Sequence, residues 1–261
     1  MEILLCNSRA DAVALTAELI AARLRATPAM VLGLATGRTM EEVYDHLATS
    51  GAPFDQCTTF NLDEYVGLPP DHPQSYATYM RQYLFDRVDI DISRTHLPDG
   101  MAEDLVAAAR DYERRIAAAG GIDLQLLGIG ASGHIGFNEP LSAFRSRTRD
   151  KILTPTTREQ NAGMFGGDPA QVPKRALTMG VGTILDSREL ILLACGSAKA
   201  DVVARAVEGP LTSRISASAI QLHTSCKVVL DAEAAAELQD IDYYRFVARN
   251  EEKWDPYRQY L

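Results

Sequence analysis

The sequence predicts a doubly wound α/β protein, in which a mostly parallel sheet carries helices on both faces. Short apolar runs, typical of buried parallel strands, alternate with longer segments whose apolar residues recur every three or four positions, as in helices. No repeat, low-complexity tract or linker divides the 261 residues, and single α/β domains often reach this length. We therefore expect one domain over residues 1–261.

The first half of the chain alternates strand and helix three times. Three short apolar runs have the length and composition of strands, and the spacing of apolar residues after each run predicts a helix. The expected strands are Ile3–Cys6, Met30–Leu34 and Thr58–Leu62, and the expected helices are Ala10–Ala26, Met40–Thr49 and Ser75–Phe85. The last of these helices has Tyr76, Tyr79, Met80 and Tyr83 on one side.

The second half continues the alternation around one polar segment. The alanine-rich stretch Asp104–Ala118 predicts a helix, because alanine is the strongest helix former. Residues 142–172 are polar and show neither period, and we expect an irregular lid over the site there. Residues 243–261 are charged and aromatic, and we expect a C-terminal extension that docks on a neighbouring subunit or frays. The remaining strands and helix are expected at Leu124–Leu127, Leu190–Ala194, Lys199–Val207 and Val228–Leu230.

Composition excludes several classes of function. A net charge of −9 argues against nucleic-acid binding, which needs a basic surface. No apolar run approaches the ~20 residues that span a bilayer, and the N-terminus lacks the features of a signal peptide. The four cysteines have no C-x-x-C spacing, which favours small buried side chains in a reducing compartment over a zinc site. We therefore expect a cytoplasmic protein without membrane or nucleic-acid partners.

A glycine-rich turn at residues 128–140 follows the strand Leu124–Leu127 and contains both His134 and Glu139. An imidazole beside a carboxylate that orients it is suited to acid/base chemistry. The first glycines of the turn satisfy the dinucleotide pattern G-x-G-x-x-G, but that site needs a helix directly after them. Pro140 disfavours helix at the residues before it, so we reject a dinucleotide site.

Two junctions between a strand and a helix are candidate phosphate sites, because free amides at a helix start attract anions. The first is the loop Ala35–Thr39, where Thr36, Gly37, Arg38 and Thr39 offer amides, hydroxyls and a guanidinium. Its alternative interpretation is a plain turn with Thr39 as the helix N-cap. The second is the turn before Lys199, and its alternative is an exposed lysine. A third candidate, Asp63 with Glu64, ends a strand and offers a general base or simply a solvated turn.

Four strings in the right order closely resemble glucosamine-6-phosphate deaminases, of the glucosamine/galactosamine-6-phosphate isomerase family. They are residues 60–67 (FNLDEYVG), 133–140 (GHIGFNEP), 146–149 (SRTR) and 176–183 (ALTMGVGT). The resemblance runs from about Leu32 to Leu230, and the GHIGFNEP string is highly specific. It implies the doubly wound fold and conversion of an amino-sugar phosphate to fructose 6-phosphate and ammonia, with no metal or organic cofactor.

The resemblance also implies roles for particular residues. Asp63 would move the proton between C2 and C1 of the open-chain sugar, and His134, polarised by Glu139, would open the pyranose ring. Thr36, Gly37, Thr39 and Lys199 would hold the phosphate.

Three positions depart from the family pattern. Ser132 stands where members usually have Asp or Asn, so we expect ring opening to be slower or differently tuned. Arg38 stands where the phosphate loop has a small residue, and Gly163 where the family has a phosphate-binding arginine. We interpret the last two together as an arginine that has moved from the lid to the loop. The rival interpretation is a different substrate, such as another amino-sugar phosphate.

Some family members are activated by N-acetylglucosamine 6-phosphate at a subunit interface, and Ser142, Arg149 and Lys151 match that effector site. Ile152 departs from it, since a threonine is common there. A homo-oligomer, with the hexamer as one form, is therefore expected, and surface salt-bridging residues are the alternative interpretation.

Two functions on the same fold remain as alternatives to the deaminase. A sugar-phosphate lactonase also carries a Gly-His turn, but it typically continues with Ser-Leu-Phe-Pro. A non-catalytic sugar-phosphate sensor would need a DNA-binding module, and no basic helix-turn-helix stands at the N-terminus.

Overall fold

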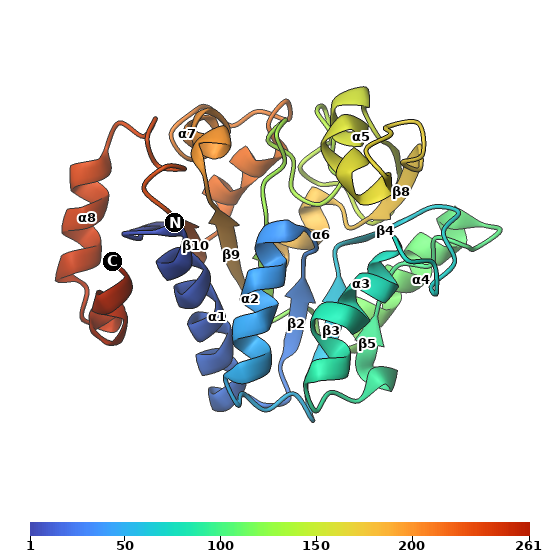
Figure 1. Ribbon diagram of the computed structural model, residues 1–261, viewed down its shortest axis with the longest axis horizontal. Coiled ribbons are helices and arrows are strands. Elements are labelled where there is room, and N and C mark those ends of the chain that lie inside the picture. Colours follow the sequence, from blue (N-terminus) through green and yellow to red (C-terminus); the bar gives the residue numbers. More distant parts are fainter.

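The computed structural model describes residues 1–261 and has a seven-stranded parallel sheet as its centre (Figure 1). The strand order is β1-β10-β9-β6-β2-β3-β5, and every neighbouring pair is parallel. The order reverses between β2 and β6, which is the switch point of a doubly wound sheet. The strands are β1 (Glu2–Leu5), β2 (Val31–Leu34), β3 (Thr58–Asn61), β5 (Thr95–His96), β6 (Leu124–Leu127), β9 (Glu189–Ala194) and β10 (Cys226–Leu230).

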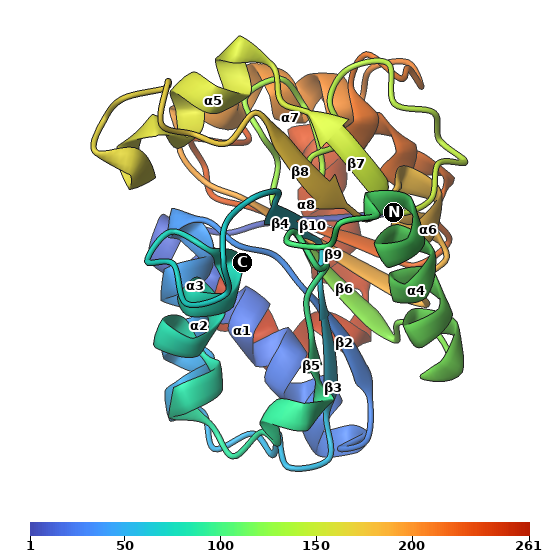
Figure 2. The same cartoon turned by 90° about the vertical axis from the view of Figure 1, so that its right-hand side faces the viewer.

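Helices cover both faces of this sheet, as predicted. Figure 2 shows α1 (Arg9–Ala26), α2 (Arg38–Thr49) and α3 (Tyr76–Tyr83) on one side and α4 (Leu105–Ala118) and α6 (Val181–Leu185) on the other. Both faces of the sheet are therefore shielded from solvent. β2 and β6 are buried along their whole length, and 62 buried residues form one continuous core. The other helices are α5 (Pro155–Asn161), α7 (Ala200–Val207) and α8 (Ile241–Asn250).

Short 3-10 helices complete the helical elements. They lie at Phe85–Arg87, Ile92–Arg94, Ala162–Phe165, Ser197–Lys199, Ser216–Leu222 and Glu252–Tyr260. No helix is long and apolar enough to cross a membrane. All four cysteines are buried and free, as predicted.

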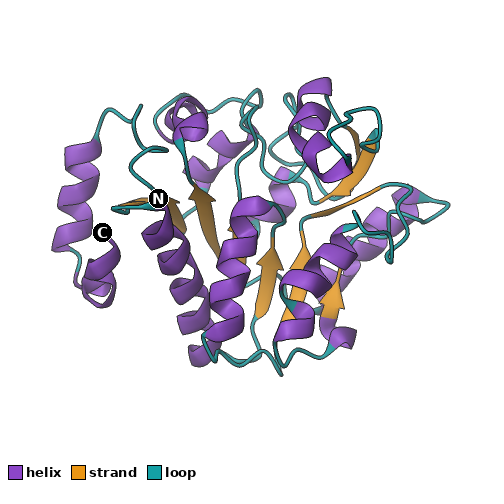
Figure 3. Ribbon diagram, in the orientation of Figure 1, coloured by secondary structure: helices purple, strands orange, loops and turns teal.

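A second, antiparallel sheet was not predicted. It has the order β4-β8-β7, with β4 (Asp63–Tyr65), β8 (Arg175–Thr178) and β7 (Arg149–Ile152), and lies beyond the carboxyl edge of the main sheet (Figure 3). The predicted strand Thr58–Leu62 therefore ends at Asn61, and Asp63 starts a new strand instead of a turn. The chain changes sheet there because Leu62 donates its amide to Leu34 of β2, while the next residues pair with β8.

The prediction that residues 142–172 are irregular is wrong. The segment contains β7, α5 and the 3-10 turn Ala162–Phe165. Helix α5 has clear start signals, since Thr154 caps it through the Thr157 amide and Pro155 occupies its first turn. β7 carries no apolar alternation because it is an edge strand of the small sheet, with Ile152 exposed.

The C-terminal segment packs against its own chain instead of fraying, and its docking on a neighbouring subunit stays a prediction. α8 lies on the edge strand β1, and the following 3-10 turns lie against α1. Trp254 is only 2% exposed, and the ammonium groups of Lys227 and Lys253 lie 6.0 and 5.7 Å from its ring centroid. Such cation–π contacts are favourable, so this segment covers the open edge of the sheet.

Candidate active site

A cavity of about 250 Å³ opens at the carboxyl ends of β2, β3, β6 and β9, over the switch point of the sheet. Doubly wound folds bind their ligands in this crevice. Seven predicted residues line it together: Thr36, Gly37, Arg38, Thr39, Asp63, His134 and Lys199. Ser132 and Glu139 do not line it, and they reach the site only through His134.

The loop between β2 and α2 forms one wall of the cavity. Gly37, not Thr39, is the N-cap of α2, and its φ of 122° lies in the region that favours glycine. The amides of Arg38 and Thr39 have no acceptor in the chain, so the positive end of α2 faces the cavity with free donors. Arg38 is exposed and makes no hydrogen bond or ion pair, which leaves its guanidinium free for an anion.

Lys199 reaches the cavity from the opposite side. It is the last residue of the 3-10 turn, one position before α7 begins. Its Nζ donates to the Ile129 carbonyl oxygen at 2.7 Å, and burial lowers its pKa. The Gly196 and Ser197 amides of the same turn donate to the Asp231 and Glu233 carboxylates. The side chain, and not those two amides, is therefore the group of this turn that could meet an anion in the cavity.

Asp63 and Glu64 have different surroundings although they are adjacent. Asp63 is 6% exposed and lines the cavity. Burial, and then the negative charge of Glu64, raises its pKa to about 8, against an opposing hydrogen bond from the Phe137 amide. Glu64 instead accepts the amides of Tyr65, Tyr76 and Ala77 at 2.8 to 3.0 Å, so it caps the start of α3.

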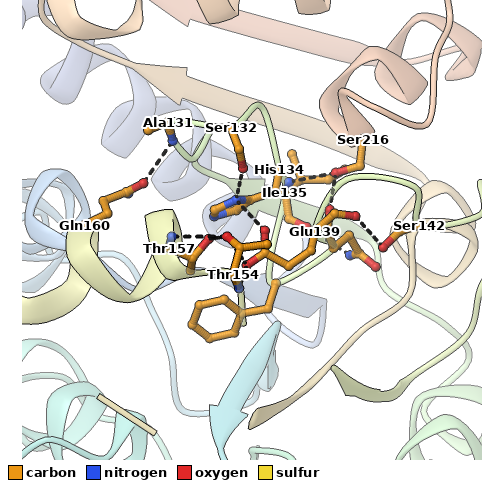
Figure 4. A network of polar contacts seen from close by, with 12 residues as sticks. Ala131, Ser132, His134, Ile135, Glu139, Ser142, Thr154, Thr157, Gln160 and Ser216 are labelled. Carbon is orange, nitrogen blue, oxygen red and sulfur yellow. Dashed lines mark hydrogen bonds and ion pairs between the residues drawn. The ribbon is translucent and has the colours of Figure 1, made fainter. Parts of the chain in front are cut away.

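His134 is held from the side away from the cavity (Figure 4). Its Nδ1 lies 2.8 Å from Ser132 Oγ and 3.8 Å from Glu139 Oε2, while its Nε2 bonds no group in the chain. A side chain at Gly130 would put its Cβ 2.1 Å from Nε2, so the glycine is required for this ring position. Burial lowers the pKa of His134, and the Glu139 charge partly opposes that shift. The imidazole is therefore neutral at neutral pH and offers Nε2 to a ligand.

Glu139 joins the glycine-rich turn to the segment that follows it. Its Oε1 accepts the Thr154 amide at 2.9 Å and the Thr154 hydroxyl at 3.2 Å, whereas its buried Oε2 has no hydrogen-bond partner. Ser132 occupies Nδ1 of His134 at the shorter distance, so Oε2 acts on the ring through its charge. Because Thr154 caps α5, the same carboxylate positions both the histidine and the helix.

The second half of the predicted lid forms part of the cavity wall. Gln160, Asn161 and Met164 line the cavity. Gln160 accepts the Ala131 amide at 3.0 Å (Figure 4), and Asn161 donates to the Tyr65 hydroxyl at 2.9 Å. The sequence did not single out these residues, or Tyr76 of α3, as site residues, because their position depends on contacts between distant segments. Gly163 has open space around it, because a Cβ at this position would meet no atom within 4 Å.

The predicted effector residues lie outside the cavity. Arg149 donates to Asn138 Oδ1 at 2.9 Å and to Ser142 Oγ at 3.0 Å, and Ser142 donates to the Glu139 carbonyl oxygen at 2.7 Å. Neither Arg149 nor Lys151 forms an ion pair, which contradicts the alternative interpretation as salt-bridging residues. Burial lowers the pKa of Arg149. No group of three or more His, Cys, Asp or Glu side chains is arranged to hold a metal ion.

The fold and the cavity define a doubly wound α/β enzyme with a loop of free amides and two buried titratable side chains, Asp63 and His134, at the carboxyl edge of its sheet. The chain belongs to the family of glucosamine-6-phosphate isomerases and 6-phosphogluconolactonases, whose sequence profile matches residues 7–229.

Several relatives cover nearly the whole chain. Glucosamine-6-phosphate deaminase of Hahella chejuensis is 49% identical over 95% of both chains, and that of Rhodopirellula baltica is 52% identical over 92% of this chain and 96% of its own. Among solved structures, a monomeric glucosamine-6-phosphate deaminase superposes with a TM-score of 0.88 at 42% identity, covering 91% of this chain and all of its own. The 6-phosphogluconolactonase of Trypanosoma brucei has a TM-score of 0.73 over 91% of this chain and 98% of its own, but only 20% identity, which shows the fold alone.

Asp63→Asn is expected to change how stability depends on pH. The raised pKa of Asp63 means that its contribution to stability is complete below pH 4 and is lost as the pH rises towards 8. The free energy of unfolding of the wild type, relative to Asp63→Asn, should fall by about 4 kcal/mol between pH 5 and pH 8. Urea denaturation at both pH values measures the difference, and Asp71→Asn at an exposed position is the matched control. A constant difference would contradict the raised pKa.

Proposed function

We propose that the chain converts glucosamine 6-phosphate and water to fructose 6-phosphate and ammonia. The observation that carries the proposal is one cavity whose lining includes Asp63 and His134 together with two cationic side chains, Arg38 and Lys199. The deaminases at 42 to 52% identity support this activity. The reaction is an aldose–ketose isomerisation followed by hydrolysis, so the site needs an anion cradle, a group for ring opening and a carboxylate base.

The phosphate would bind between the start of α2 and Lys199. The free amides of Arg38 and Thr39, with the helix dipole behind them, favour an anion there. Lys199 would exchange its bond to the Ile129 carbonyl for a phosphate oxygen, which restores the charge that burial disfavours. Thr36 and Thr39 are the hydroxyl donors in the same wall.

His134 would open the pyranose ring by moving a proton from the C1 hydroxyl to the ring oxygen. Its neutral state leaves Nε2 able to accept the hydroxyl proton, and the resulting imidazolium is stabilised by the Glu139 charge 3.8 Å from Nδ1. Ser132 Oγ accepts the hydrogen bond from Nδ1–H in both states, because Nδ1 carries a proton when Nε2 is the base and also in the imidazolium. The proton that His134 takes up is returned to the ring oxygen, so the residue ends unchanged.

Asp63 would then move one proton within the open-chain sugar. The ionised carboxylate takes the proton from C2 and gives it to C1, while one proton of the ammonium group passes to the C1 oxygen. C1 then carries a hydroxymethyl group, and C2 is left as an iminium. The ammonium group that the substrate carries on C2 favours the ionised form of Asp63 once it is bound, and so offsets the burial that raises its pKa. Water adds to the iminium carbon, and the C–N bond breaks to release ammonia and the ketose.

Two other functions of this fold have weaker support. The lactonases share the fold at about 20% identity, and no contact in the site favours a lactone over an amino sugar. A different amino-sugar phosphate would use the same base and the same cradle. Non-catalytic sensing has no supporting observation. The four buried free thiols and the phosphorylated substrate support a cytoplasmic location.

Asp63→Asn is expected to abolish turnover without preventing binding. Asparagine keeps the size of the side chain and an oxygen for the Phe137 amide, but it has no basicity at neutral pH. Release of ammonia from glucosamine 6-phosphate should fall at least about 100-fold in kcat, while inhibition by inorganic phosphate should persist. No ammonia from the folded wild type would contradict the proposal, and 6-phosphogluconolactone and other amino-sugar phosphates would then be the substrates to test.

Arg38→Ala is expected to raise the KM for glucosamine 6-phosphate about tenfold or more, because a hydrogen bond to a charged group contributes about 1.5–3 kcal/mol. The arginine borders the cavity and has no partner in the chain, which supports its transfer from the lid to the loop. Gly163→Arg is the matched variant. It should lower KM in the Arg38→Ala background and do little in the wild type, and an unchanged KM for Arg38→Ala would refute the transfer.

The homo-oligomer, with the hexamer as one form, and its effector site remain proposals from the family resemblance. Arg149 is half-buried without a carboxylate partner, so an effector phosphate beside Ser142 and Lys151 would supply its missing counterion. Light scattering is expected to report an oligomer, and N-acetylglucosamine 6-phosphate is expected to activate it less in Arg149→Ala. A monomer that shows no activation would contradict both and would match the monomeric state named for one related deaminase.

A further inference from the structure

Two tyrosine hydroxyls bind carbonyl oxygens of the loop that precedes α2. Tyr79 of α3 donates to the Gly37 carbonyl oxygen at 2.9 Å, and Tyr44 of α2 donates to the Ala35 carbonyl oxygen. Both side chains are buried, and their rings meet edge to face with centroids 6.5 Å apart. Neither tyrosine lines the cavity, so neither would touch a bound substrate.

These bonds decide which backbone groups of the loop face the cavity. A carbonyl oxygen turned towards a phosphate would repel it, whereas an amide attracts it. The Gly37 carbonyl also accepts the Met40 amide at 2.8 Å, so it points along α2 and away from the cavity. Gly37 has no side chain to limit the rotation of its backbone, and its φ is 122°. The Tyr79 hydroxyl is the side-chain group that restrains this peptide.

The first turn of helix α3 is bonded to β4, the strand that contains Asp63. Glu64 accepts the amides of Tyr76 and Ala77, each at 3.0 Å. Glu64 is the neighbour of Asp63 in β4. One short helix therefore connects the peptide at Gly37 to the residue adjoining Asp63.

We propose that Tyr79 is a positioning residue for the phosphate loop, and that α3 sets the separation between the bound phosphate and Asp63. The inference rests on the proposed function, because it takes Arg38 and Thr39 to be phosphate donors. Without the hydroxyl, only the Met40 and Glu41 amides hold the Gly37 carbonyl, so the peptide between Gly37 and Arg38 is restrained less and its N–H is aimed less well at the phosphate. Tyr79 acts on the affinity for phosphate and not on the proton transfers.

The test is Tyr79→Phe, which removes one oxygen and leaves the aromatic packing in place. The KM for glucosamine 6-phosphate and the inhibition constant of inorganic phosphate should both rise about five- to tenfold, the effect of one lost hydrogen bond of about 1 kcal/mol. The kcat should stay within twofold. Tyr83→Phe is the matched control, because Tyr83 is one turn away on α3 and its hydroxyl is near Glu41, not the loop; both of its constants should stay within twofold.

The outcomes separate the two proposals. Ammonia release by the wild type with equal KM and phosphate inhibition in Tyr79→Phe would overturn the positioning role and leave the proposed function standing. A wild type that is folded but releases no ammonia from glucosamine 6-phosphate would overturn the proposed function and, with it, this inference. If thermal melting shows that Tyr79→Phe is unfolded, Tyr44→Phe takes its place with the same expected rise, and a change in kcat alone would overturn the inference.

Discussion

The parallel alignment of β2, β3, β6 and β9 is the constraint on which the site depends. Because all four strands run in the same direction, the segments that leave their carboxyl ends meet at one edge. These segments are far apart in the sequence and carry the phosphate loop, Asp63, His134 and Lys199. The strands hold this register because they are apolar and buried on both faces, so a shift of one strand would expose core side chains.

Burial in the site holds its ionisable groups in protonation states that a substrate can change. Burial disfavours the charged forms of Asp63, His134 and Lys199. It therefore raises the pKa of Asp63 and lowers the pKa values of His134 and Lys199. An amino-sugar phosphate carries an ammonium group at C2 and a phosphate at C6. The ammonium would be the counterion of Asp63, and the phosphate would be the counterion of Lys199. A chain with a net charge of −9 can bind an anion in this way because the field at the cavity is local.

The sequence predicted every strand of the main sheet except the two-residue strand β5, and it predicted the charged and catalytic candidates of the cavity, because these depend on local patterns. Buried strands read as apolar runs, and the glycine-rich turns follow them directly, so Thr36, Asp63, His134 and Lys199 were found. The small sheet was missed because β4 and β7 are polar and short, and their pairing with β8 joins residues about 115 and 25 positions apart. Gln160 and Asn161 were missed for the same reason, since their place in the cavity follows from the Glu139–Thr154 contact across the fold.

The adjacent acids Asp63 and Glu64 show how one strand divides the work of the site. Successive residues of a strand point to opposite faces, so only one of the two carboxylates can line the cavity. Glu64 accepts two amides at the start of α3, those of Tyr76 and Ala77, and its charge beside Asp63 contributes to the raised pKa of that carboxyl. The same residue thus positions the helix that restrains the Gly37 peptide and adjusts the group that would act as the base. A one-residue shift of β4 would exchange the two carboxylates, so that Asp63 would no longer line the cavity and Glu64 would no longer bind α3. The antiparallel pairing of β4 with β8 therefore matters as much to the chemistry as the main sheet does.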